Sequence, residues 1–248
     1  MNYLWLLILV LLVLAGFGLY KLFNYALQQR MASYAKQVML SDLRAIRAQM
    51  NPHFIFNSLN SINRYILKNE PDIASDYLGR FAKLMRLVLD NSNHERISLA
   101  MELEAMQLYV ELELLRFEHA FNYVVQVSEH IEPDKILVQP LIFQPFLENA
   151  IWHGLMHKEE GERLLSLSID EREGRMICEI TDTGVGRGKV KVDGEERRRS
   201  YGINLVRDRL KFLDSLAEIK ILDLTDAQKR PAGTKVIMNF KKTEEYSL

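Results

Sequence analysis

The sequence of 248 residues predicts an α+β protein in which an N-terminal transmembrane helix and a helical hairpin precede an α/β sandwich. Three observations support this fold class: an uncharged apolar run at the start, two amphipathic helical segments after it, and short β-like runs beyond about residue 115. The net charge of −1 is too balanced to suggest direct nucleic-acid binding. The single cysteine, Cys178, excludes an intrachain disulfide and a cysteine-based zinc cluster.

The apolar run at residues 3–20 has eighteen residues without a charge, which is just enough to cross a bilayer. The basic residues Lys21, Arg30 and Lys36 follow this run, whereas a secretory signal peptide carries its basic residues before it. The pattern favours an uncleaved single-pass anchor at residues 1–22 over a cleaved or buried segment. We therefore expect the chain in the inner (cytoplasmic) membrane, with a linker helix at residues 23–41 and the remainder in the cytoplasm.

Apolar residues then recur at helical spacing and change phase at Pro52, where the missing backbone hydrogen bond predicts a bend. After Pro52 one face of the helix is apolar and the opposite face is polar. The apolar face holds Ile55, Leu59, Ile62 and Ile66, and the polar face holds His53, Asn57, Asn60 and Arg64. Taken alone, His53 is consistent with a solvated surface histidine.

A second amphipathic helix is predicted from about residue 73 to residue 89, after the break "KNEPD". Two helices joined by a short turn form an antiparallel hairpin, which has too little core to be stable by itself. Two copies could bury their apolar stripes as a four-helix bundle, so residues 42–116 are predicted to form the dimerisation region of a homodimer.

The β-like runs define a second region, predicted to span residues 117–243 and to be followed by a short tail at 244–248. The runs are "NYVVQVS", "LLSLSID", "MICEITD", "IKILDL" and "TKVIMNF". Helices are expected at about residues 138–153 and 202–216, between the first two runs and between the third and fourth. Strands interleaved with helices in this way indicate one sheet covered by helices on one side.

The motif "QPFLENAIWHG" at residues 144–154 places Asn149 and His153 one helical turn apart on the same face. An amide oxygen such as that of Asn149 is a suitable ligand for Mg²⁺, and the neighbouring Glu148 could position or polarise an attacking group. A polar helix edge with no function is the alternative interpretation. The pair His153 and His157 lacks the acidic residue of a metalloprotease helix.

In "ITDTGVGRGK" an apolar strand ends at Asp182, a carboxylate that could accept a hydrogen bond from an exocyclic amine such as that of adenine. Gly184 and Gly186 would permit a tight turn close to a ligand, although many surface turns have this pattern. The following residues 187–203 are rich in charge and lack an apolar period. They read either as a solvated loop or as a mobile basic flap over phosphates.

In order, "QMNPHFIFNSLNSI", "QPFLENAIWHG", "DTGVG" and "GTKV" resemble the LytS-type sensor histidine kinases, whose ATP-binding half belongs to the gyrase, Hsp90 and MutL superfamily. The resemblance covers about residues 42–241 and implies an ATP-dependent protein histidine kinase of two-component signalling. It implies a role for each matched residue. These roles are phosphoacceptor for His53, catalytic assistant for Glu148, Mg²⁺ ligand for Asn149, adenine contact for Asp182, nucleotide turn for Gly184 and Gly186, start of the helix after the lid for Gly202, and closure of the pocket for Gly233 and Thr234.

The resemblance also implies that the phosphoryl group passes to an aspartate of a response regulator, of the LytTR DNA-binding type. Two positions depart from the family pattern: Trp152 stands where lysine is common, and Ser200 replaces a glycine after the lid. A cationic phosphate contact would then come from His153, Arg187 or Arg207. An inactive pseudokinase scaffold and a non-kinase ATPase of the same superfamily are the alternatives. Since two residues precede the anchor, no extracellular sensor domain is expected.

Overall fold

The computed structural model describes residues 16–25, 52–187 and 195–244, which fall in two compact units, residues 1–54 and 55–248. In the first unit, residues 16–25 are helical. Within the three described ranges, no helix has both the length and the apolar character needed to cross a bilayer. The first fifteen residues of the predicted anchor, and all but the first three of the predicted linker helix at 23–41, lie outside these ranges.

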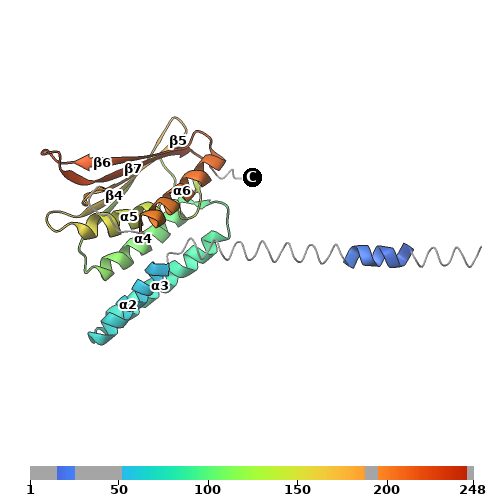
Figure 1. Cartoon of the computed structure of the whole chain (residues 1–248), viewed down its shortest axis with the longest axis horizontal. Helices are drawn as coiled ribbons and strands as arrows, with labels where there is room; N and C mark the ends of the chain where they lie inside the picture. The colour runs from blue at the N-terminus through green and yellow to red at the C-terminus, as the bar shows by residue number, and fades with distance from the viewer. Residues whose placement is uncertain (1–15, 26–51, 188–194, 245–248) are drawn as a thin grey trace, which may run out of the picture. The chain divides into compact units, whose positions relative to one another are not determined.

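Three helices follow: α2 (Pro52–Leu67), α3 (Pro71–Ser92) and α4 (Leu99–Arg116). Pro71 occupies the start of α3, where its missing N–H needs no partner, and the Ser98 side chain accepts a hydrogen bond from the backbone of Met101 to cap α4. The hairpin α2–α3 is therefore confirmed, and α3 packs along α4 (Figure 1). The predicted bend at Pro52 depends on residues outside the described ranges.

The apolar stripe of α2, which was predicted to be buried between two copies, is only partly buried within one chain. Ile62 is buried, but Leu59 and Ile66 are exposed. The buried face instead contains Ser58, Ser61 and Tyr65. Their hydroxyl groups have partners, so polar residues can line this contact: Tyr65 donates to the Leu115 carbonyl at 2.6 Å, and the Tyr77 hydroxyl lies 3.4 Å from that of Ser58.

A five-stranded sheet has the order β2-β4-β5-β7-β6, in which β2 and β4 are parallel and the other neighbours are antiparallel. All five predicted strands are confirmed. Their bounds are β2 Asn122–Val127, β4 Leu164–Arg172, β5 Arg175–Asp182, β6 Glu218–Thr225 and β7 Pro231–Lys241. Two short strands, β1 (Ile97–Ser98) and β3 (Leu137–Val138), pair with each other and were not predicted.

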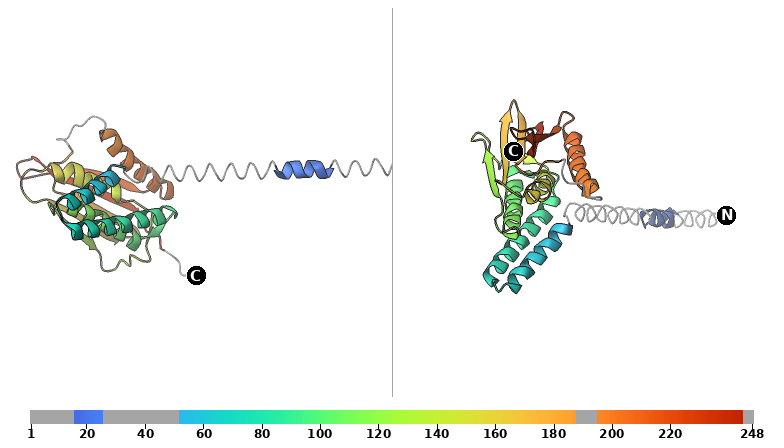
Figure 2. Two further views of the ribbon diagram at one scale, coloured as in Figure 1. Left: turned by 90° about the horizontal axis from the view of Figure 1, so that it is seen from below. Right: turned by 60° about the vertical axis from the view of Figure 1, so that its left-hand side comes forward.

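One face of the sheet is covered by α4, α5 (Gln144–Asn149) and α6 (Glu195–Leu213), as Figures 1 and 2 show. Alternate residues of the central strands fill the core beneath these helices. They include Leu165, Leu167, Ile169, Met176, Cys178, Ile180 and Met238. Burial also raises the pKa of the Cys178 thiol, so this cysteine is a core residue. The predicted α+β class, with helices on one side of the sheet, is thus confirmed.

Two helix starts differ from the expected positions. The helix expected from residue 138 begins at Gln144, because residues 137–138 form β3 and Pro140 and the positive φ of Leu141 interrupt helical geometry. The helix expected from Gly202 already begins at Glu195. Glutamate and arginine have high helix propensity, and they extend α6 through a segment without an apolar period.

Candidate functional site

A cavity with about 560 Å³ of empty space, open to solvent, lies between the sheet and the helices of its covered face. The lining of this cavity combines residues that the sequence predicted for the site with apolar side chains. The lining residues are Phe146, Asn149, Ala150, His153, Gly154, Ile180, Asp182, Gly186, Arg187, Ile203, Ile221, Thr234 and Val236. Six residues singled out from the sequence therefore converge: Asn149, His153, Asp182, Gly186, Arg187 and Thr234.

Asp182 reaches this cavity because it is the last residue of β5 and pairs with Thr234 in the register of β5 with β7. Its side chain is 4% exposed. Burial raises the pKa of this carboxyl to about 6, while hydrogen bonds from the Gly184 N–H (2.8 Å) and from the Thr234 hydroxyl and N–H act in the opposite direction. The carboxylate remains mostly ionised at pH 7 and is ready to accept one more hydrogen bond.

At this edge of the sheet, Gly184 and Gly233 allow three backbone segments to approach one another closely. A Cβ atom on Gly184 would lie 2.2 Å from the carbonyl carbon of Gly154, and one on Gly233 would lie 1.9 Å from the carbonyl oxygen of Asp182. Gly233 also has a φ of +132°, which other residues rarely adopt. Neither residue is among the lining residues of the cavity, so the two glycines act as spacers rather than as ligand contacts.

The helix that carries Asn149 changes from α-helical to π-helical geometry directly after this residue. Residues Ala150–Gly154 form a π-helix and Leu155–His157 a 3₁₀-helix, an irregularity that is common at functional sites. The Asn149 amide donates to the Pro145 carbonyl at 2.7 Å, which leaves its oxygen as the atom that could bind a cation. The described residues contain no group of three or more histidine, cysteine or acidic side chains suited to a metal ion.

Glu148 points elsewhere. It accepts a hydrogen bond from Gln144 at 2.9 Å and contributes to raising the pKa values of Tyr109 and Glu113 of α4, and it is absent from the described lining of the cavity. Gly202 also lies apart, in the interior of α6, where a Cβ atom would meet Pro145 at 3.4 Å. Its expected place at the start of a helix is therefore wrong. His53 is the second residue of α2, and its side chain lies outside the described part of the chain.

Two basic side chains lie at or near the cavity. Arg187 lines it and forms a two-point ion pair with Asp223 of β6, with distances of 2.7 and 2.8 Å. Lys158 donates to the carbonyl oxygens of Glu162 and Thr183, at 2.7 Å each, and lowers the pKa of Asp182. Most of the predicted basic flap, residues 188–194, lies outside the described ranges.

Two buried carboxyls of α4, Glu102 and Glu113, were missed from the sequence. Glu102 accepts hydrogen bonds from the N–H groups of Leu141 (2.9 Å) and Phe143 (3.4 Å) and so holds the turn before α5. Burial raises its pKa to about 7. The signal was present in "AMELEAM" for Glu102 and in "YVELELLRF" for Glu113, where acids interrupt a helix that is buried on most sides.

A sequence profile for the family described as histidine kinase matches residues 41–121, the segment that contains His53, α2, α3 and α4. The chain is 28% identical over 177 residues to the sensor histidine kinase YpdA of Escherichia coli K12, covering 70% of this chain and 30% of the relative. It is 29% identical over 152 residues to the sensor histidine kinase/phosphatase LytS of Staphylococcus aureus MRSA252, covering 61% and 26%.

These matches make the chain similar to LytS-type sensor histidine kinases over its histidine kinase segment and the region that follows. The chain spans about 30% or less of the length of the two curated relatives. Among solved structures it is similar to the histidine kinase domain of the blue-light activated kinase EL346 of Erythrobacter litoralis. That match has 13% identity and a TM-score of 0.42, and covers 77% of this chain and 95% of the other.

Proposed function

We propose that this chain is a membrane-anchored sensor histidine kinase that phosphorylates His53 with ATP and passes the phosphoryl group to an aspartate of a response regulator. The observation that supports this most is the convergence of Asp182, Thr234 and Asn149 on one cavity, in a chain whose His53 segment matches the histidine kinase family. A candidate nucleotide site and a candidate phosphoacceptor thus occur in one polypeptide.

The cavity suits an adenine nucleotide with Mg²⁺. Apolar walls from Ile180, Ile221 and Val236 could contact the base, and the ionised Asp182 carboxylate could accept a hydrogen bond from its amino group. Asn149 would offer an oxygen to the metal, and Arg187 a cation to the phosphates. When bound, Mg²⁺ would neutralise charge on the phosphate oxygens.

The chemistry proposed for His53 is direct nucleophilic attack. A neutral imidazole nitrogen forms an N–P bond to the γ-phosphorus of ATP, the bond from that phosphorus to the bridging oxygen breaks, and ADP leaves with the electron pair. The ring must also lose its proton. Glu148, outside the cavity lining and on the side of α5 that faces α4, is proposed as the carboxylate that positions the imidazole or accepts that proton.

The membrane anchor is proposed from the uncharged run at residues 3–20, with the kinase part in the cytoplasm. The partner is proposed to be a response regulator of the LytTR type, in keeping with the family resemblance. Through that regulator the kinase would influence DNA without binding nucleic acid itself. His53 would serve two partners in turn, first ATP and then the regulator.

The test of this function is to incubate the purified chain with γ-labelled ATP and Mg²⁺ and then to challenge the label with acid and with base. An N–P bond is labile in acid and comparatively stable in alkali, whereas phosphoserine shows the reverse pattern. We expect a label that disappears in acid and survives mild base. ATP binding without label would support the pseudokinase alternative, and ATP hydrolysis without label would support a non-kinase ATPase; either result would contradict the proposal.

Asp182→Asn should weaken ATP binding by about 1.5–3 kcal/mol, the contribution of a hydrogen bond to a charged group. The asparagine would present an amide in a buried position where the carboxylate already accepts from Gly184 and Thr234. Titration calorimetry measures the effect. The exposed Asp134, which is not among the lining residues, provides the control Asp134→Asn. Equal ATP affinity of Asp182→Asn and wild type, with the fold intact, would exclude the adenine contact.

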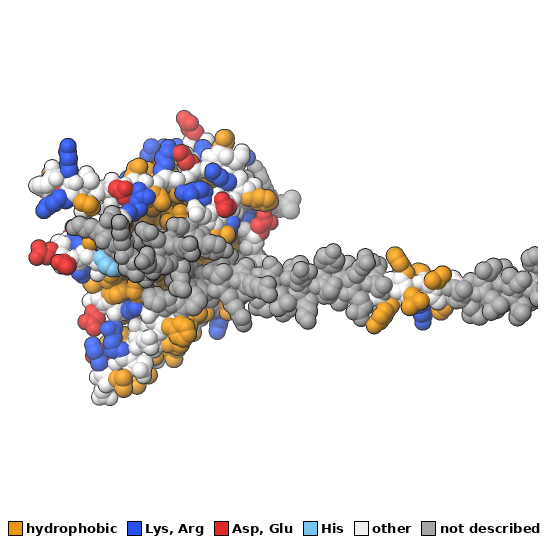
Figure 3. Space-filling view, viewed as in Figure 1, with side chains coloured by type: hydrophobic (Ala, Val, Ile, Leu, Met, Phe, Trp, Pro, Cys, Tyr) orange, Lys and Arg blue, Asp and Glu red, His pale blue; other side chains and the backbone are white. Residues whose placement is uncertain are grey.

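The hairpin should form a homodimer through apolar side chains that the chain leaves exposed, and Figure 3 shows hydrophobic surface on this part of the molecule. These side chains belong to α2 and α3. They are Phe56, Leu59, Ile66, Leu67, Ile73, Leu78 and Leu89. Leu59 and Leu78 are 49% and 51% exposed, so neither is needed for the core of one chain.

Leu59→Glu and Leu78→Glu should each convert a dimer into monomers, because each places a charge in the predicted interface. Light scattering on detergent-solubilised protein, or on a fragment without the first 29 residues, measures the mass. Ser75→Glu, at an exposed polar position of α3, is the control and should stay dimeric. A monomeric wild-type protein at micromolar concentration would contradict the four-helix interpretation.

A further inference from the structure

The ion pair between Arg187 and Asp223 lies beside the nucleotide cavity. The Arg187 Nε and Nη2 atoms lie 2.7 and 2.8 Å from the two carboxylate oxygens of Asp223. The Arg187 side chain lines the cavity, whereas Asp223 is not among the described lining residues. Exposed ion pairs usually contribute little to stability, and these two side chains are 49% and 54% exposed. A role in ligand binding is therefore a better explanation for this pair than stability of the fold.

The register of the sheet explains why Asp223 lies within reach of Arg187. Asp182, at the end of β5, pairs with Thr234 of β7, and Thr234 pairs in turn with Asp223 of β6. Residues paired in this way point to the same face of the sheet, which for the buried Asp182 is the face covered by helices. Ile221, two residues before Asp223 on the same strand, lines the cavity and so has the same direction.

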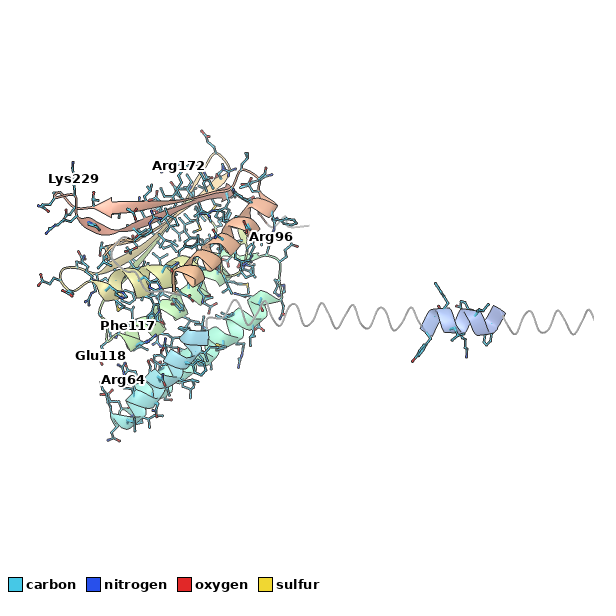
Figure 4. The ribbon with its side chains drawn as sticks, in the orientation of Figure 1. Arg64, Arg96, Phe117, Glu118, Arg172 and Lys229 are labelled. Carbon is cyan, nitrogen blue, oxygen red and sulfur yellow. The ribbon has the colours of Figure 1, made fainter. Side chains whose placement is uncertain are left out.

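The turn after β5 carries the chain across the start of β7 toward β6. Gly186 has a φ of +71°, and a Cβ atom on it would lie 3.2 Å from the Cβ of Pro231, the first residue of β7. Arg187 follows directly, so its ion pair fastens the end of this turn to β6. In Figure 4, Lys229 marks the turn between β6 and β7 at this end of the sheet, and Arg172, the last residue of β4, marks the opposite end.

The two short contacts with Asp223 use one edge of the guanidinium group. Nε and Nη2 donate to Asp223, so the edge formed by Nη1 and the second N–H of Nη2 is directed elsewhere. Nη2 also makes a long contact of 3.5 Å with the Ile221 carbonyl oxygen, which a phosphate oxygen could replace. This second edge has the fork geometry that binds phosphate at two points. A carboxylate on the first edge thus fixes the direction of the fork before a ligand arrives.

The charges of the cavity support an anion at this place. Among the described lining residues, Arg187 is the one with a permanent positive charge, and Asp182 is the one carboxylate. One strand separates Asp182 from Asp223, so two strand spacings, about 10 Å, lie between the proposed amine site and the ion pair. Arg207, another candidate from the sequence, donates to Asn204 within α6 at 2.8 Å and is not among the described lining residues. A ligand with an amine at one end and a phosphate at the other fits Asp182 and Arg187.

We propose that Asp223 is a positioning residue for nucleotide binding: it orients the Arg187 guanidinium so that the second edge meets a phosphate group of the nucleotide. The proposal rests on the proposed function, because it requires an adenine nucleotide in the cavity. Its physical basis is pre-organisation, since an arginine side chain that is already ordered loses less conformational entropy when the phosphate binds. Asp223 does not touch the ligand, so its effect must pass through Arg187.

The experiment combines three variants of the full-length protein with a series of ligands. Arg187→Gln removes the cation, Asp223→Asn removes the charge that orients it, and the double variant tests whether the two residues act together. Glu179→Gln is the matched control, since Glu179 forms an ion pair with Lys235 at 2.6 Å on the opposite face of β5 from the buried Ile180. Titration calorimetry in the presence of Mg²⁺ measures the dissociation constants of adenosine, AMP, ADP and ATP, and thermal unfolding checks the fold.

Asp223→Asn should weaken ATP binding by about two- to tenfold, the effect of ordering one long side chain on binding. Arg187→Gln should weaken it by at least about tenfold, because a hydrogen bond between charged groups is lost. Adenosine has no phosphate and should bind to both variants and to wild type equally within about twofold, as expected for sites that do not interact. Across the series, the loss should appear with the first phosphate that reaches Arg187 and persist in the longer nucleotides. In the Arg187→Gln background, Asp223→Asn should have no further effect.

Four results would overturn the proposal. The first is a wild-type ATP affinity of Asp223→Asn, and the second is tighter ATP binding by this variant, which would make Asp223 a competitor of the phosphates. The third is an equal loss for adenosine and ATP, as a purely structural role in the turn requires. The fourth is additive losses in the double variant.

If Arg187→Gln does not fold, the comparison of adenosine with ATP in Asp223→Asn still decides. The control Glu179→Gln should bind all four ligands as wild type does. A wild-type protein that binds neither adenosine nor ATP contradicts the proposed function itself. ATP binding that is the same in wild type and in every variant contradicts only this inference.

Discussion

His53→Gln should abolish phosphorylation of the protein while ATP binding stays within about twofold of wild type. Glutamine has no nitrogen that can attack phosphorus, so the loss should reach the detection limit rather than a fraction of the rate. Binding should persist because Asp182, Thr234 and Asn149, which line the nucleotide cavity, all belong to the sandwich. The measurement combines the acid-labile label with titration calorimetry on the same preparation.

The control for this prediction is His94→Gln. His94 is an exposed histidine that follows α3 and is not among the described residues that line the cavity. Its variant should be labelled as wild type is, which separates loss of the phosphoacceptor from a general effect of removing a histidine. If His53→Gln carries as much label as wild type, His53 is an ordinary surface histidine and the phosphoacceptor must be sought elsewhere.

Gly184→Ala should eliminate ATP binding and destabilise the fold by more than about 3 kcal/mol, above the usual cost of overpacking. The added Cβ would lie 2.2 Å from the carbonyl carbon of Gly154, and the atoms around it are backbone, which has no rotamer to change. The Val185 N–H donates to the Gly154 carbonyl at 3.2 Å, and separation of the two segments would also break this bond.

Thermal unfolding should detect this loss as a decrease in melting temperature of about 6–12 °C for a domain of this size. The matched control is Gly79→Ala, since a Cβ on Gly79 would meet nothing within 4 Å in the middle of α3. That substitution should stabilise the protein by roughly 0.5–1 kcal/mol, the difference in helix propensity. A Gly184→Ala protein that melts with wild type would refute the close approach of these segments.

The strands were predictable because alternation of apolar residues is a local pattern, whereas the meeting of the Asp182 and Thr234 motifs followed only from the family resemblance. Alternating apolar residues identify β5 and β7, and their pairing places the Asp182 and Thr234 motifs side by side. The start of α5 was not predictable, because it depends on the positive φ of Leu141. It also depends on Glu102, 39 residues earlier, whose carboxylate accepts a hydrogen bond from the Leu141 N–H. Glu102 and Glu113 are ionisable residues, which are usually exposed, and the apolar residues on both sides of them in α4 are the one hint in the sequence that they are buried.

The face of α2 that is buried within the chain was not predicted, for a related reason. Hydrophobic periodicity places Leu59 and Ile66 on an apolar face, which is the face predicted to meet a second copy, whereas Ser58 and Ser61 occupy the contact within the chain. Small hydroxyl residues allow close helix packing when their polar atoms have partners, and the Tyr77 hydroxyl supplies one. Periodicity alone cannot tell a surface buried within one chain from a surface reserved for a second copy.

The arrangement of the sheet also has a kinetic consequence. β4 and β5 form one local hairpin and β6 and β7 another, and the pairing of β5 with β7 joins them. Local hairpins close quickly, whereas a contact between residues far apart in sequence must first overcome loop-closure entropy. The edge that holds Asp182 is then the last part of the sheet to assemble, and a nascent chain acquires its nucleotide pocket only when β7 has been synthesised.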